Sequence, residues 1–73
     1  MGGTIYTKTH KLLVGKLIDA RKKAGLKQVE AAKKLGRSQS YISKIEIGQR
    51  RVDIVQLKEL AALYKKKLDF FIK

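Results

Sequence analysis

The side chains with the most usable chemistry in this sequence are amides, hydroxyls and cations. They gather between residues 28 and 51, where three glutamines, three serines and three arginines occur. Such groups recognise a ligand through hydrogen bonds and charge. Bond-breaking chemistry has no comparable set, because the single histidine, His10, has no cysteine, second histidine or paired carboxylates beside it. We therefore expect a binding protein without enzymatic activity, metal or cofactor.

The charge balance of the chain favours an anionic partner. Eighteen lysines and arginines stand against six acidic residues, which gives a net charge of +12 at pH 7. This excess makes the chain repel itself, and a polyanion such as nucleic acid would relieve the repulsion. Lysines that only keep the surface soluble would give the same balance. Charge alone leaves both interpretations open.

The length of 73 residues allows one domain. Apolar residues make up 44% of the chain and cysteine is absent, so the core must be purely apolar. No apolar run reaches the roughly 18 residues of a membrane span, and the first residues lack the apolar stretch of a signal peptide. We expect a cytoplasmic protein without a membrane partner. Residues 1–8 are assigned to a flexible lead-in and residues 9–73 to the domain.

Glycines, caps and apolar spacing divide the domain into five helices, so the predicted fold class is all-α. The first helix is predicted over residues 10–24 and is ended by Gly25. The others are predicted over residues 28–35, 38–47, 53–64 and 68–72. Ser38 is the expected N-cap of the third helix, and Asp53 with Gln56 forms the expected capping box of the fourth.

Residues 28–47 have the spacing of a helix-turn-helix. The first of its two helices is predicted to turn Val29, Ala32 and Leu35 inward, and Gly36 supplies the left-handed turn between them. Ala32 is small where the helices cross, and isoleucines of the second helix fill the angle. A helical hairpin in an unrelated all-α domain would share this spacing.

Four segments carry a resemblance to a known family: GLKQ (25–28), AAKKLG (31–36), SQSYISKIE (38–46) and GQR (48–50). Over about residues 12 to 72 the chain resembles the Cro and phage-repressor family, often called Xre. The resemblance implies a lambda-repressor-like five-helix bundle that binds double-stranded DNA, with the helix over residues 38–47 in the major groove. It also implies a bacterial or phage regulator of transcription, most simply a repressor associated with the nucleoid.

The helical phase indicates which side chains read the bases. With Ile42 and Ile45 turned inward, a rotation of about 100° per residue leaves the outer face to polar side chains. Glutamine bonds to adenine, lysine to guanine, and serine to several base edges. The predicted base-reading residues are Gln39, Ser40 and Lys44.

The predicted contacts to the DNA backbone surround this helix. They are Gln28, Arg37, Tyr41, Ser43, Arg50 and Arg51. Gln28 opens the first helix of the motif, where free amides attract a phosphate, and family members use the matching glutamine in this way. The arginines flank the groove as cationic clamps. Solvation alone would also explain each arginine, and Tyr41 could equally pack at the edge of the core.

The resemblance also implies a partly buried ion pair, Arg21 with Glu46, in a structural role. For partners we expect a homodimer on a two-fold related site, because one recognition helix reads only about four base pairs. The dimer surface would be residues 64–72 or the loop around Arg50. The alternative function is an antitoxin that also binds a toxin protein, through the apolar residues 70–72.

Overall fold

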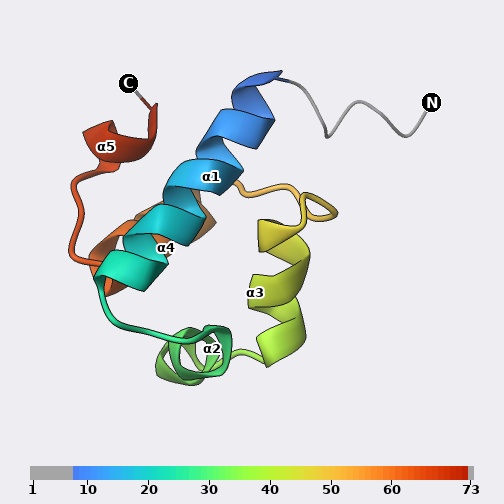
Figure 1. The fold of residues 1–73 in the computed structure, drawn as a ribbon, viewed down its shortest axis with the longest axis vertical. Helices are drawn as coiled ribbons and strands as arrows, with labels where there is room; N and C mark the ends of the chain where they lie inside the picture. The colour runs from blue at the N-terminus through green and yellow to red at the C-terminus, as the bar shows by residue number, and fades with distance from the viewer. Residues whose placement is uncertain (1–7, 73) are drawn as a thin grey trace.

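The computed structural model describes residues 8–72, and this part of the chain folds into five helices without a strand (Figure 1). The helices are α1 (Lys8–Lys23), α2 (Gln28–Leu35), α3 (Gln39–Glu46), α4 (Ile54–Leu63) and α5 (Leu68–Ile72). The prediction of an all-α, five-helix bundle is confirmed. Residues 1–7 of the predicted lead-in lie outside the described residues, whereas Lys8 already belongs to α1.

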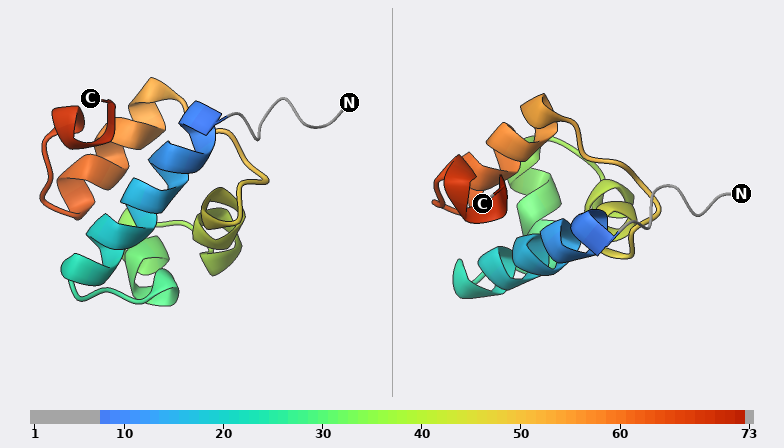
Figure 2. Two further views of the ribbon diagram at one scale, coloured as in Figure 1. Left: turned by 45° about the horizontal axis from the view of Figure 1, so that its top comes forward. Right: turned by 90° about the horizontal axis from the view of Figure 1, so that it is seen from above.

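The helices surround one core. α2 packs against α3 and α4, while α1 packs against α3 and α5. In Figures 1 and 2, α5 lies beside α4 on the opposite side of the molecule from α3. The largest fully buried side chains are Leu17, Ile42, Ile45 and Leu60. Side chains from α1, α3 and α4 therefore meet at the centre of the core. This packing holds α3 with its other face toward solvent.

The burial of α2 corrects the sequence analysis at one position. Val29, predicted to point inward, is 52% exposed, whereas Ala31 is fully buried beside Ala32. The buried stripe is the helical set 28, 31, 32 and 35, so its first position is the polar Gln28, which is half-buried. Apolarity alone therefore predicts that Val29 is buried, whereas the position next to it, Gln28, begins the buried stripe. α1 ends at Lys23, one residue before its predicted end, and Ala24 beyond it is exposed.

Local sequence signals determine the helix ends. The capping box of α4 is present: Asp53 Oδ1 accepts from the Gln56 backbone N–H at 2.7 Å, and Gln56 Oε1 accepts from the Asp53 N–H at 3.0 Å. Gly36 has φ 71°, the left-handed conformation that the turn between α2 and α3 requires. Ser38 occupies the N-cap of α3, but its hydroxyl makes no capping hydrogen bond, contrary to the prediction.

Candidate nucleic-acid interface

The outer face of α3 carries the three predicted base-reading side chains. Gln39, Ser40 and Lys44 are all exposed, whereas Ile42 and Ile45 on the opposite face are almost fully buried. Ser43 is partly exposed between these faces. In the described helix the exposed face has no carboxylate, because the single acid of α3, Glu46, is buried. Such a face presents donors and acceptors to a ligand without repelling an anion.

A hollow of about 290 Å³ gathers several of the predicted site residues along α3. Its lining comprises Arg37, Ser38, Ser40, Tyr41, Lys44 and Arg50. The loop that brings Arg50 there is attached to α3, since the N–H groups of Gln49 and Arg50 both donate to the Lys44 carbonyl, at 2.9 and 3.2 Å. Residues thirteen positions apart in the sequence thus form one cationic concavity.

Tyr41 is the floor of this concavity. Its side chain is only 6% exposed, and the guanidinium carbons of Arg37 and Arg50 lie 4.6 and 5.0 Å from the centroid of its ring. Both distances are those of cation–π contacts. Burial raises the pKa of the Tyr41 hydroxyl, and the two arginines oppose this effect. The ring therefore restrains two cations that face solvent.

The hydroxyl of Tyr41 is buried, which argues against its predicted contact with a phosphate. The oxygen is enclosed and has no hydrogen-bond partner among residues 8–72. An enclosed oxygen is closed to a phosphate group on the surface. The structure instead shows the alternative that the sequence left open, in which Tyr41 packs at the edge of the core.

Arg37 and Arg51 differ in their surroundings. Arg37 also approaches α4, with Nη2 at 3.8 Å from Glu59 Oε1 in an exposed pair that contributes little stability. Arg51 is exposed and lines a second hollow of about 540 Å³ with Arg50 and Asp53. The two hollows share Arg50, which places this residue at the centre of the cationic surface.

A chain of hydrogen bonds runs from the core to the start of α3. Arg21 donates to Glu46 through Nε at 2.7 Å and Nη2 at 3.1 Å, which is the ion pair that the resemblance implies. Glu46 Oε1 also accepts from Gln28 Nε2 at 3.0 Å, and Gln28 Oε1 accepts from Gln39 Nε2 at 3.5 Å. A buried ion pair is thus connected through the amide of Gln28 to Gln39, a predicted base reader.

The bond between Glu46 and Gln28 was missed by the sequence analysis, which gave the ion pair a purely structural role. A signal for it exists in the sequence. Gln28 occupies the first position of the buried stripe of α2, so its amide needs a partner inside the protein. Hydrogen bonding with Glu46 raises the pKa of Arg21, although burial opposes this, and keeps its charge in place.

Two other classes of site are absent from the described part of the chain. Residues 8–72 contain no group of three histidine, cysteine, aspartate or glutamate side chains placed to hold a metal ion. Over the same residues, no helix has both the length and the apolarity needed to cross a membrane.

Comparison with known proteins identifies the family of this chain. A family model described as helix-turn-helix matches residues 17–71, which includes all of α2, α3 and α4. No curated protein matches the chain in a sequence search. The matched family consists of DNA-binding domains. The chain therefore belongs to the Cro/C1-type, Xre-like helix-turn-helix family.

Proposed function

We propose that this protein is a cytoplasmic, sequence-specific DNA-binding regulator of transcription that acts as a repressor with α3 in the major groove. The observation that carries the proposal is the exposed, carboxylate-free face of α3 with Gln39, Ser40 and Lys44. These side chains offer bonds to adenine and guanine edges. Fixing Gln39 through Gln28 lowers the conformational entropy that would be lost on binding.

The phosphate contacts in this proposal come from both sides of α3. Arg50 and Arg51 reach one strand from the loop, and Arg37 reaches the backbone from the turn before α3. Ser43 adds a hydroxyl. Gln28 uses one amide hydrogen on Glu46, which leaves the other for a phosphate at the start of α2. Tyr41 acts through the two arginines that it restrains.

A homodimer on a two-fold related site completes the proposal, because paired half-sites lie about one helical turn apart. The loop around Arg50 is the surface that the structure favours for the dimer. Three exposed apolar residues flank it in the chain: Ile47, Ile54 and Val55 are each more than half exposed. In the C-terminal alternative, Tyr64 and Phe71 are buried in the monomer.

The antitoxin alternative requires an exposed apolar surface at residues 70–72, and much of that surface is buried. Phe71 is 4% exposed in the core, and Phe70 packs edge-on against it with ring centroids 5.0 Å apart. Ile72 is left as the exposed apolar residue of that segment. No feature of residues 70–72 calls for a toxin partner.

Selection of bound duplexes from a random pool tests the proposal. We expect an enriched two-fold related sequence with two chains per duplex. Titration at several salt concentrations is expected to give a slope of about 0.9 per neutralised phosphate in log affinity against log salt. A single half-site bound by one chain would contradict the dimer. A pool without enrichment and a flat salt dependence would contradict DNA recognition itself.

A further inference from the structure

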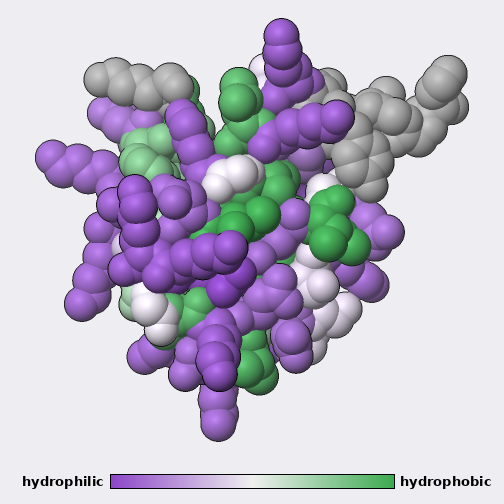
Figure 3. Space-filling view, viewed as in Figure 1, coloured by the Kyte–Doolittle hydropathy of each residue, from purple (hydrophilic) through white to green (hydrophobic). Residues whose placement is uncertain are grey.

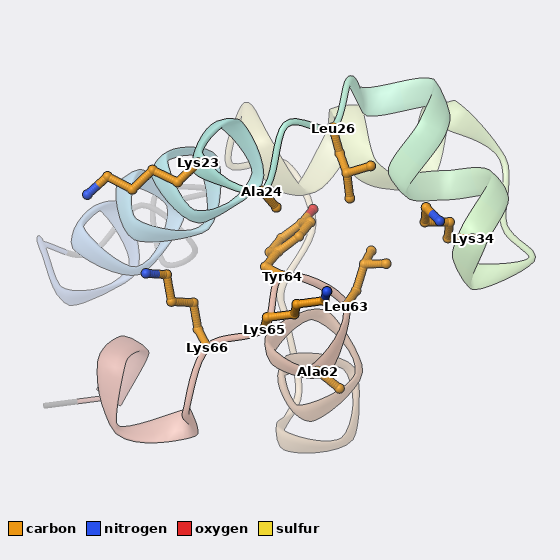
Figure 4. A pocket seen from close by; sticks show the side chains of 9 residues that line it. All are labelled: Lys23, Ala24, Leu26, Lys34, Ala62, Leu63, Tyr64, Lys65 and Lys66. Carbon is orange, nitrogen blue, oxygen red and sulfur yellow. The ribbon is translucent and has the colours of Figure 1, made fainter.

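A second basic surface lies where α1, α2 and α4 end. It is a groove of about 690 Å³ between the last turns of these helices (Figure 4). Its floor is apolar and contains Leu26, Leu63 and Tyr64. Tyr64 is 3% exposed, and in Figure 4 its ring rises from the end of α4 toward the loop after α1.

Four lysines stand around this floor: Lys23, Lys34, Lys65 and Lys66. Lys23 pairs with Asp19 at 3.2 Å, and Lys66 Nζ lies 5.0 Å from the centroid of the Phe70 ring. Lys34 and Lys65 have no acidic partner among residues 8–72. Three helix C-termini supply only about 1.5 negative charges, at about half a charge each, so a positive excess remains. Figure 3 shows hydrophilic side chains around apolar patches on the face of the molecule seen in Figure 1.

The backbone at Lys65 is a second, independent feature. Lys65 has φ 57°, a left-handed conformation that ordinarily favours glycine. Among residues 8–72, no other non-glycine residue adopts it. Its N–H donates to the Ala62 carbonyl at 3.2 Å and so closes the turn after α4. A lysine here keeps a cation at the rim of the groove in spite of the strain.

This groove is separate from the proposed DNA surface. None of its lining residues belongs to α3. It lies at the end of α4, whereas Arg50 and Arg51 lie before the start of that helix, and ten helical residues span about 15 Å. Its cations are all lysines, without the arginine forks that match phosphate geometry. Its apolar floor also has no counterpart on a sugar–phosphate backbone.

We propose that the groove docks a short acidic and apolar segment of a partner protein. Apolar side chains of that segment would cover Leu26 and Leu63, while its carboxylates face Lys34 and Lys65. Charge complementarity selects this occupant, since the two lysines lack partners within the described chain. The volume suits a few side chains, as in recognition of a helix or a strand by a groove.

The probe that tests the proposal is a labelled synthetic peptide of alternating glutamate and leucine, measured by fluorescence anisotropy near physiological salt. Two peptides of equal length serve as controls, one of glutamate and serine and one of glutamine and leucine. The first peptide is expected to bind at least about tenfold more tightly than either control. Equal binding of the glutamate–serine peptide would overturn the proposal, because charge alone would then explain the affinity.

Matched variants locate the binding site. The double variant K34E/K65E removes the two unpaired lysines of the groove, and K11E/K58E makes the same change in charge at exposed positions outside it. We expect the groove variant to weaken the peptide about tenfold or more and the control about threefold at most. Circular dichroism checks that both variants fold. Equal losses in the two variants would overturn the proposal.

Amide chemical shifts of the unchanged protein give a measurement that depends on no variant. The peptide should shift residues 23–26 and 62–66 and leave α3 unchanged, also when a selected duplex saturates the protein. Shifts confined to α3 would overturn the proposal. A duplex that shifts residues 62–66, and binds K34E/K65E more weakly than K11E/K58E, would show that the groove takes nucleic acid instead.

Discussion

The two basic surfaces of this molecule are each built over a buried tyrosine, and they restrain their cations differently. Over Tyr41, Arg37 from before α3 and Arg50 from after it stack on the ring, and a hydrogen-bonded chain from Arg21 reaches Gln39. Around Tyr64, the cations are lysines on flexible stems. Fixed guanidinium forks suit the regular geometry of a phosphate backbone, whereas point charges on mobile stems suit an acid whose position varies.

The largest expected effect comes from the hydrogen-bonded chain that begins at Arg21 and ends at Gln39. Glu46→Ala leaves the Arg21 guanidinium buried without its carboxylate and removes the acceptor for Gln28. We expect the free energy of unfolding to fall by about 3 to 5 kcal/mol, measured by urea denaturation. DNA binding should weaken further, because Gln39 loses its support.

The double variant R21M/E46L sharpens this result, since it removes both charges and keeps an apolar volume. Stability should recover to near the original value or above it. Preference for the selected duplex should not recover, because Gln28 still lacks its acceptor. Full recovery of that preference would show that the ion pair contributes to folding alone.

A pH titration tests the other surface through Tyr64, whose pKa burial raises to about 12. An unfolded tyrosine has a pKa near 10, so between about pH 10 and 12 the folded state holds the proton that the unfolded state has lost. The corresponding stability is present below about pH 10 and is lost as the pH rises. We expect a loss of about 2 to 3 kcal/mol, by urea denaturation at each pH.

Tyr64→Phe is the control for this titration. The lysines also lose charge over the same range in both proteins, so the difference between the two pH profiles isolates the tyrosine. Parallel profiles would mean that the Tyr64 hydroxyl ionises as readily in the folded state as in the unfolded state.

Within the surface over Tyr41, substitutions of the base-reading residues and of the phosphate-binding arginines should have different effects on DNA binding. Gln39→Ala or Lys44→Ala should lose about 1 to 3 kcal/mol of discrimination at one base pair, while Arg50→Ala should weaken all duplexes alike and reduce the salt slope by about one. Binding to the selected duplex and to its single-base variants measures both. If Arg50→Ala changed the base preference and Gln39→Ala did not, α3 would be the wrong reading helix.

The smallest expected effect is at the turn after α4. Lys65→Gly removes the strain of a left-handed lysine and should raise the free energy of unfolding by about 0.5 to 1 kcal/mol, seen as a higher melting temperature. Lys65→Ala keeps the strain and serves as the matched control. If Lys65→Gly lowered the melting temperature, the lysine side chain itself would be stabilising the turn.

Much of the fold could be predicted because its signals are local. Gly36 and the capping box of Asp53 with Gln56 act within a few residues of themselves, and the helix ends follow them closely. The exposed face of α3 followed from the burial of Ile42 and Ile45 at helical spacing. Regular helical phase transfers directly from sequence to structure.

The rest depends on how distant segments pack. The sequence could not show that the ring of Tyr41 lies beneath two arginines, one from each end of α3, because that contact requires the loop after α3 to fold back. Val29 was placed inward because the buried stripe of α2 begins with a polar residue. The lysine-lined groove joins three helix ends from separate parts of the chain, so no single stretch of sequence carries its pattern.

The hydrogen-bonded chain that ends at Gln39 has a consequence for how this protein could acquire a new operator. Gln28 bonds directly to the buried Glu46, which pairs with Arg21 of α1, so changing Gln28 also disturbs the scaffold. Ser40 and Lys44 are exposed on the same helix, and neither shares in that chain. A combinatorial library confined to these two positions should therefore yield altered operator preferences while the melting temperature stays constant, which makes them the natural starting point for redesign.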